Sequence, residues 1–327
     1  MSFKNIHGHE RQVRFLLMTL ERKRMPHAYL FSGMTGVGKR SVALELAKVI
    51  NCADKASPAD ACDRCPSCLK MTQGNHPDFV SIEPEGQFVR IESIRSMQNQ
   101  MQFAPLEGPY RIVVVNDADK MHITSANALL KTLEEPPPRN LLVLITANPN
   151  GLPRTILSRC QRIHFPPLGR EVIASHLVKQ HGLTDADASM IAGTSGGSLA
   201  RAIEMVQEDF KSLRDRTMED LTAIHDKNMM KMLTFTNNFG KDRTDIIRKL
   251  DIIQSCYRDA LVYRETGKER SLLNRDRMDI IEPLSRRFDG KRLLEHLRTV
   301  GQALQAIDRN ANKALTLEAM MFKLVHQ

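Results

Sequence analysis

A glycine-rich loop between an apolar strand and an amphipathic helix constrains the fold of this chain most strongly. Residues 33–39 read Gly-Met-Thr-Gly-Val-Gly-Lys. Residues 28–32 before them form a short apolar run, and residues 41–51 after them carry apolar side chains at helical spacing. In that context the glycines let successive backbone N–H groups face phosphate oxygens, with the positive end of the helix behind them. The sequence therefore predicts a phosphate-loop α/β domain.

Two positions that normally hold magnesium in such a site are altered. Arg40 follows the lysine where a hydroxyl residue is expected, and Asn116-Asp117 follows the strand predicted at 111–115 where Asp-Glu is expected. These changes leave ATP or ADP binding open, argue against Mg²⁺, and predict slow or absent hydrolysis; any remaining role of Asp117 or Asp119 also stays open. The residues assigned to this degenerate nucleotide site are Gly33, Thr35, Gly36, Val37, Gly38, Lys39, Arg40, Asn116 and Asp117.

The first half of the chain alternates between strand and helix patterns, which is typical of a parallel sheet covered on both faces. Further strands are predicted at 79–82, 111–115, 141–146 and 162–165, and helices at 91–101, 125–134 and 153–159.

Beyond Pro166-Pro167 the strand signal disappears and helical spacing dominates. Helices are expected at 171–181, 186–192 and 291–307, a further helix begins at 196–198, and a last one contains Leu317, Met320, Met321 and Leu324, whose spacing favours core packing. We expect three domains: a nucleotide-binding-like domain at 1–166, a helical lid at 167–209 and a C-terminal helical collar at 210–327.

Four cysteines, spaced Cys52-x9-Cys62-x2-Cys65-x2-Cys68, indicate a structural metal site. A redox pair needs only two of them, whereas four thiolates close the tetrahedral shell that zinc prefers. We therefore predict a zinc module at 52–68, held by Zn²⁺ rather than by disulfides. Cys160 and Cys256 are expected to be packed thiols.

Composition limits the other classes of protein. The chain has 327 residues and a net charge of +9, which permits contact with nucleic-acid phosphates without identifying a partner. The N-terminal residues contain no apolar signal region, and no apolar run approaches the roughly 18 residues that span a bilayer. We expect a cytoplasmic protein with no membrane partner.

Several motifs together resemble the bacterial clamp-loader subunits of the AAA+ class, which include the gamma/tau and delta prime subunits of DNA polymerase III. The resemblance is strong over the first 165 residues and weak over the helical remainder. The motifs are the segment at 28–33, the cysteine cluster, His76-Pro77-Asp78, the segment 126–136 (Ala-Asn-Ala-Leu-Leu-Lys-Thr-Leu-Glu-Glu-Pro) and the segment 155–160 (Thr-Ile-Leu-Ser-Arg-Cys).

Departures from the motor pattern decide between the two classes. Motor subunits keep a hydroxyl after the lysine, Asp-Glu after the third strand, and an arginine directly after Gly-Ser-Leu. This chain has Arg40, Asn116 and Gly197-Ser198-Leu199-Ala200, with Arg201 displaced by one residue. These departures and the short C-terminus resemble the delta prime class.

That resemblance implies an accessory subunit with little or no ATPase activity of its own. Arg159 would act in trans as an arginine finger on ATP held by a neighbouring motor subunit. The implied partners are the gamma/tau and delta subunits of a hetero-pentamer, the sliding clamp and primed DNA. Arg95 is a candidate for DNA contact, and either Thr146 or Asn148 occupies the sensor position.

Two other functions stay open. The intact loop at 33–39 is also expected in an ATP-hydrolysing clamp-loader motor of the same fold. The cysteines and the positive net charge are also expected in a zinc-dependent nucleic-acid-binding module. Turnover by the lone chain favours the first alternative, and tight DNA binding lost on Cys65→Ser favours the second.

Overall fold

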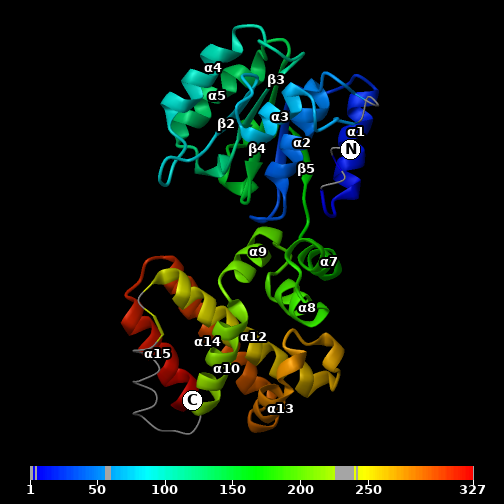
Figure 1. The fold of residues 1–327 in the computed structure, drawn as a ribbon. Coiled ribbons are helices and arrows are strands. Elements are labelled where there is room, and N and C mark those ends of the chain that lie inside the picture. Colours follow the sequence, from blue (N-terminus) through cyan, green and yellow to red (C-terminus); the bar gives the residue numbers. More distant parts are fainter. Residues whose placement is uncertain (1–2, 4–5, 56–59, 225–238, 241, 327) are drawn as a thin grey trace. The chain divides into compact units, whose positions relative to one another are not determined.

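The computed structural model describes residues 3, 6–55, 60–224, 239–240 and 242–326. The chain forms two compact units (Figure 1). The first unit contains Met1–Gln180 and Ser195–Ala202, and the second contains His181–Thr194 and Ile203–Gln327.

A five-stranded parallel sheet forms the centre of the first unit, as the sequence predicted. The strand order is β2-β3-β4-β1-β5, so β1, which leads into the glycine loop, lies between β4 and β5. The strands are β1 (Ala28–Ser32), β2 (Phe79–Ile82), β3 (Arg111–Val115), β4 (Asn140–Thr146) and β5 (Gln161–His164).

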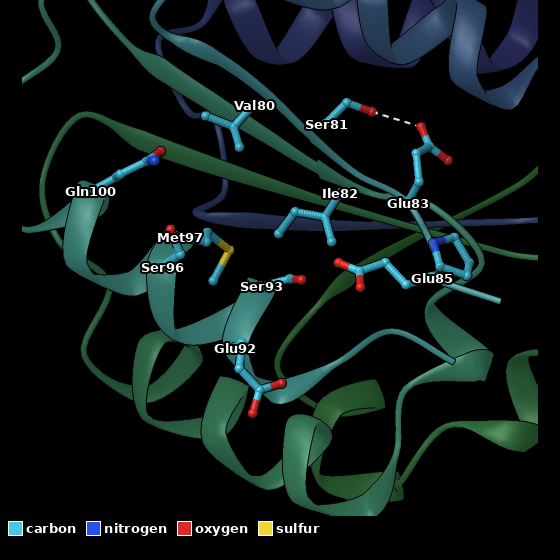
Figure 2. A pocket seen from close by; sticks show the side chains of 11 residues that line it. Val80, Ser81, Ile82, Glu83, Glu85, Glu92, Ser93, Ser96, Met97 and Gln100 are labelled. Atoms are coloured by element: carbon cyan, nitrogen blue, oxygen red, sulfur yellow. Dashed lines mark hydrogen bonds between the residues drawn. The ribbon is translucent and has the colours of Figure 1, made fainter. Parts of the chain in front are cut away.

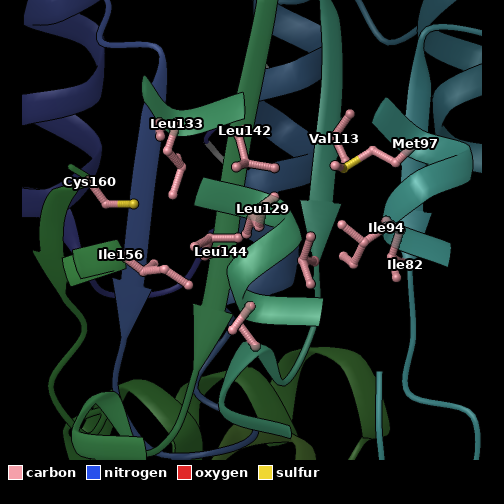
Figure 3. Packing of buried hydrophobic residues seen from close by; sticks show 14 of the residues in the cluster. Ile82, Ile94, Met97, Val113, Leu129, Leu133, Leu142, Leu144, Ile156 and Cys160 are labelled. Carbon is pink, nitrogen blue, oxygen red and sulfur yellow. The ribbon is translucent and has the colours of Figure 1, made fainter. Parts of the chain in front are cut away.

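Helices cover both faces of this sheet. Alternate residues of a strand point to opposite faces, so Leu142 and Leu144 of β4 enter one core while Leu141 and Val143 enter the other. Because both faces are buried, β4 is apolar almost without interruption. Figure 3 shows the core on the side of α4 (Ile91–Met101), α5 (Ile123–Glu134) and α6 (Arg154–Leu157). The other core packs against α1 (Glu10–Glu21), α2 (Lys39–Asn51) and α3 (Pro66–Gln73).

The predicted boundaries agree closely with the structure in the sheet. β1, β2, β3 and α4 have the predicted bounds, β4 begins one residue earlier than predicted, and β5 begins and ends one residue earlier. The sequence did not predict α1 and α3. Two short 3-10 turns, Ala118–Lys120 and Pro149–Gly151, follow β3 and β4.

Helices account for the remainder, as expected. In the second unit α12 packs against α10, α13 and α14, and α14 packs against α15. Met320 and Met321 of α15 are buried, which confirms that this methionine pair belongs to a core. The helices after the sheet are α7 (Arg170–His181), α8 (Asp185–Thr194), α9 (Leu199–Gln207), α10 (Phe210–Ile224), α12 (Arg243–Thr266), α13 (Met278–Arg287), α14 (Gly290–Asp308) and α15 (Lys313–His326).

None of the helices in the described ranges is both long and apolar enough to cross a membrane. The division of the helical part into a lid at 167–209 and a collar at 210–327 stays a prediction. Within the predicted zinc module, residues 56–59 lie outside the described residues.

Candidate functional site

The glycine loop joins the carboxyl end of β1 to the first turn of α2. Gly36 and Gly38 have φ of 80° and 104°, which is left-handed backbone that glycine adopts without strain. A side chain on Gly33 would meet the Phe165 carbonyl oxygen at 2.2 Å. The Gly36 carbonyl accepts a hydrogen bond from the backbone N–H of Ala200 at 3.1 Å. The loop therefore packs closely against Phe165 and is hydrogen-bonded to Ala200.

Other contacts hold the buried part of the loop. The imidazole Nε2 of His9 lies 2.8 Å from the Val37 carbonyl oxygen, and burial lowers the pKa of His9 despite this bond. Val37 is only 1% exposed, whereas Thr35 is exposed at the tip of the loop. Val37 therefore packs the loop onto the domain, and Thr35 faces solvent.

The Lys39 side chain is turned back on the loop. Its ammonium donates hydrogen bonds to the carbonyl oxygens of Gly33, at 2.5 Å, and Met34, at 2.8 Å. The side chain is 6% exposed, and this burial lowers the pKa of Lys39 although Asp117 and Asp119 oppose the shift. The predicted contact of Lys39 with terminal phosphates stays a prediction.

Both altered magnesium positions converge on one carboxylate that the sequence analysis did not identify, that of Glu83. The Arg40 guanidinium lies 3.0 Å from Glu83 Oε1, and the Asn116 amide donates to the same oxygen at 2.9 Å. The Ser81 hydroxyl also donates to Oε1, at 3.0 Å. Asn116 is 8% exposed, so its amide is fixed in this arrangement. A cation and an amide thus contact a carboxylate where a phosphate-loop enzyme would gather magnesium ligands.

A cleft of about 580 Å³ opens beside this network, between β2 and α4. Figure 2 shows the Ser81 hydroxyl directed toward the Glu83 carboxylate at the edge of the cleft. Glu85 and Glu92 also line it, although Glu85 pairs with Arg90 at 3.1 Å.

The residues that follow β3 and β4 meet at the same edge of the sheet. Asp117 adopts a left-handed conformation, with φ of 46°, and its carboxylate accepts from Lys120 at 2.8 Å. Thr146 is fully buried and donates to the Asp119 carboxylate at 2.5 Å. Asn148 is exposed, and its backbone N–H donates to the Thr146 hydroxyl at 2.9 Å. The structure therefore connects Thr146 with Asp119, while the sensor assignment stays a prediction.

Arg159 lies just beyond α6, away from the glycine loop in sequence. One terminal nitrogen, Nη1, donates to the Thr155 carbonyl at 3.0 Å and lies 3.3 Å from the Ser158 hydroxyl. The other, Nη2, lies 2.9 Å from a carboxylate oxygen of Glu134 at the end of α5. The neighbouring Cys160 is buried, and burial raises its pKa to about 12. Cys160 thus anchors the segment and leaves Arg159 partly exposed.

The four clustered cysteines come together as predicted. Cys52 follows the last residue of α2, and Cys65 caps the N-terminus of α3. The sulfur atoms of Cys52, Cys62, Cys65 and Cys68 all lie within 4.8 Å of one another, and those of Cys52 and Cys65 are 4.0 Å apart. Four thiolates at about 2.3 Å from a tetrahedral zinc lie about 3.8 Å from each other. The donor set and its spacing therefore fit a metal ion.

The surroundings favour a thiolate at Cys65, whereas burial raises the pKa of Cys52 and of Cys68. Burial opposes ionisation of Cys65, but hydrogen bonds from the backbone N–H groups of Cys68 and Ala53 lower its pKa to about 6. The buried ammonium of Lys48 lies 3.0 Å from Glu45 on the same helix and 3.2 Å from Asp63 between two of the cysteines. This cation ties the cysteine loop to α2, the helix that begins at the glycine loop.

The His76-Pro77-Asp78 motif holds a neighbouring loop rather than a ligand. Asp78 is fully buried and accepts from the backbone N–H groups of Leu106, Glu107 and Gly108 at 2.7 to 2.9 Å. Burial alone would raise the pKa of Asp78, but these donors and the Arg111 guanidinium hold it below the usual value. The motif therefore has a structural role in this chain.

Comparisons with known proteins agree with these observations. The family described as "DNA polymerase III, delta subunit" matches residues 8–169, and its C-terminal counterpart matches residues 208–326. DNA polymerase III subunit delta prime of Bacillus subtilis is 29% identical over 318 residues, which cover 96% of this chain and 95% of that protein. The chain belongs to the delta prime/tau/gamma family of DNA polymerase III clamp-loader subunits.

Two other members of the family are also similar in sequence to this chain. The delta prime subunit of Pseudomonas aeruginosa is 28% identical, and the match covers 92% of each chain. The tau subunit of Bacillus subtilis is 26% identical over 98% of this chain, which corresponds to 61% of that longer protein. The match to the delta prime subunits therefore extends over nearly their whole length.

Proposed function

We propose that this chain is a delta prime-type stator of the clamp loader, a subunit that does not hydrolyse ATP itself and lends Arg159 to a motor neighbour. The observation that carries this proposal is the convergence of Arg40 and Asn116 on Glu83. The guanidinium neutralises the Glu83 carboxylate that could otherwise attract a divalent cation, and an amide supplies no negative charge in its place. Magnesium-dependent hydrolysis in the chain's own site is therefore disfavoured.

The placement of Arg159 supports the second half of the proposal. Its planar fork of N–H donors matches the oxygens of a transferring phosphoryl group. The side chain is 36% exposed, and it lies beyond α6 rather than beside the glycine loop of its own chain. A phosphate presented by another subunit can therefore reach it.

The remaining assignments follow from the family. We propose partners of the gamma/tau and delta type in a hetero-pentamer that opens a sliding clamp and loads it on primed DNA in the cytoplasm. The segment 167–209 is assigned to a lid and the segment 210–327 to a collar that holds the pentamer together. Zinc bound by the four cysteines has a structural role, because four thiolates leave no open coordination position.

Reconstitution with the motor and delta subunits tests the proposal. ATP turnover by the motor is expected to need this chain, and Arg159→Ala is expected to lower the stimulated rate by about a thousandfold or more. Arg154→Ala is the matched control, since Arg154 is an exposed arginine on α6, the short helix that ends just before Arg159. Stimulation that survives Arg159→Ala removes the finger from the proposal.

ATP turnover by the purified chain alone tests the other half of the proposal, that this subunit does not hydrolyse ATP itself. We expect no magnesium-dependent hydrolysis above background. Brisk turnover that disappears with Lys39→Ala would instead identify a motor subunit, the alternative that the intact loop at 33–39 favours.

A further inference from the structure

The contacts of Arg159 point to a second residue with a role in the proposed finger. We propose that Glu134 is a positioning residue, whose carboxylate fixes the orientation of the Arg159 guanidinium for a phosphate in trans. This inference rests on the proposed function of Arg159 and adds to it a residue that neither the motif at 155–160 nor the glycine loop contains.

The first argument is geometric. Acceptors from two separate elements hold the two terminal nitrogens of Arg159: Glu134 contacts Nη2 at 2.9 Å, and Thr155 contacts Nη1 at 3.0 Å. An arginine side chain has about 2 kcal/mol of rotamer entropy, and fixing both ends of its fork removes much of that freedom before a phosphate arrives. Nη1 also contacts the Ser158 hydroxyl at 3.3 Å, so the Nε–H and the second hydrogen of Nη2 remain for a ligand.

The second argument is the rigidity of the two elements. Leu133, next to Glu134, is 3% exposed, and Ile156 and Cys160, on either side of Arg159, are also buried. All three belong to one hydrophobic core, and α5 packs against α6 (Figure 3). Both partners of the pair are therefore mounted on packed backbone, as positioning within a fraction of an ångström requires.

The third argument is electrostatic. Glu134 is the last residue of α5, where the partial negative charge of the helix end makes a carboxylate unfavourable by roughly 0.3–1 kcal/mol. The pair with Arg159 is half exposed, at 36% and 51% of the two side chains, so it adds little stability. Glu134 therefore stabilises neither its helix nor the fold to a large extent. Its contact with Arg159 is the better explanation for an acidic residue at this position.

The experiment uses the reconstituted clamp loader and separates geometry from charge. Glu134→Gln keeps an oxygen acceptor for Nη2 without a charge, and Glu134→Ala removes both. We expect Glu134→Ala to lower the turnover number of the motor by about tenfold with little change in KM, because a displaced finger affects only the transition state. Glu134→Gln is expected to keep most of the activity.

Glu135→Ala is the matched control, since it removes an exposed carboxylate from the same helix end. Circular dichroism checks that each variant is folded. Wild-type turnover in Glu134→Ala, or equal effects of the alanine and glutamine variants, overturns the positioning role. Arg159→Ala in the same assay tells the two proposals apart. If it has no effect, the proposed finger itself is wrong; if it abolishes stimulation while Glu134→Ala does not reduce it, only the role of Glu134 is wrong.

Discussion

Replacing Asp78 by asparagine tests whether the His76-Pro77-Asp78 motif is structural. The substitution preserves size but replaces one carboxylate oxygen with an amide group that donates. One orientation of the amide turns this donor toward the Leu106 N–H, and the other turns it toward the N–H groups of Glu107 and Gly108. Either way the carboxylate charge is lost beside the buried guanidinium of Arg111, which lies 3.5 Å away.

The magnitude follows from these contacts. A hydrogen bond to a charged group contributes about 1.5–3 kcal/mol, and breaking a buried ion pair costs about 3–5 kcal/mol. Arg111 keeps hydrogen bonds to the carbonyl oxygens of Phe103 and Ala104, which reduces the penalty. We therefore expect Asp78→Asn to lower the free energy of unfolding of the first unit by about 2–4 kcal/mol.

Urea unfolding followed by circular dichroism measures this change, with Asp54→Asn as the control. Asp54 also pairs with an arginine, Arg64, at 3.1 Å, but both side chains are mostly exposed. The control is expected to change stability by less than about 0.5 kcal/mol. Asp78→Asn with an effect no larger than the control would refute a structural role for the buried carboxylate.

The pH dependence gives an independent check. The pKa of Asp78 is lower in the folded chain than in the unfolded chain. Its contribution is therefore fully present above the unfolded value of about 3.9 and is lost as pH falls through the folded value. Below about pH 4, the wild type should lose stability more steeply than Asp78→Asn.

Three further predictions concern other parts of the molecule. One equivalent of zinc per chain should be found by elemental analysis, and removing it with a chelator or by Cys65→Ser should lower the melting temperature, because zinc binding contributes on the order of 10 kcal/mol. Arg40→Thr combined with Asn116→Asp should increase magnesium-dependent ATP affinity on the order of tenfold in calorimetry, about 1.4 kcal/mol. Either change alone should have a smaller effect, because Arg40→Thr still lacks the carboxylate at position 116 and Asn116→Asp still keeps the arginine cation. Arg214→Ala should lower the free energy of unfolding of the second unit by about 1.5–3 kcal/mol in urea, since Arg214 is 1% exposed and bonds Asp215 and Asp276, whose carboxylates are partly exposed.

The sheet could be predicted from sequence because its signals are local. β1, β3 and β4 are buried on both faces, so each appears as an apolar run with clear ends. The amphipathic α4 was predicted with its full bounds. The glycines of the loop and the four cysteines could also be identified from spacing, since their chemistry depends on residues close together in the chain.

The missed helices have weaker local signals. In α1 only Leu16 is fully buried, and exposed arginines interrupt the apolar pattern. The start of α3 does carry a signal, with Pro66 at its first position after the capping residue Cys65. Interpreting the cysteines only as metal ligands concealed that signal.

The partners of the candidate site could not be predicted, because they are tertiary contacts. Glu83 meets Arg40 and Asn116 only once β2 is placed beside β3 and close to α2. Strand order does not follow from the strand sequences themselves. In the same way, Glu134 meets Arg159 only through the packing of α5 on α6.

The contrast between these two arginines explains why one of them suits a partner's phosphate and the other does not. Arg40 pairs with a carboxylate that Asn116 and Ser81 also hold, so withdrawing it disturbs a network that includes a buried amide. Arg159 pairs with Glu134 alone among carboxylates in the described part of the chain, and both side chains are partly exposed. An exposed ion pair contributes only about 0–1 kcal/mol, so Glu134 orients Arg159 without adding much stability, and the Nε–H of Arg159 remains for a phosphate. Under the proposed function, Arg40 therefore occupies the Glu83 carboxylate at the chain's own loop, whereas Arg159 is oriented by Glu134 for a phosphate held by a neighbour.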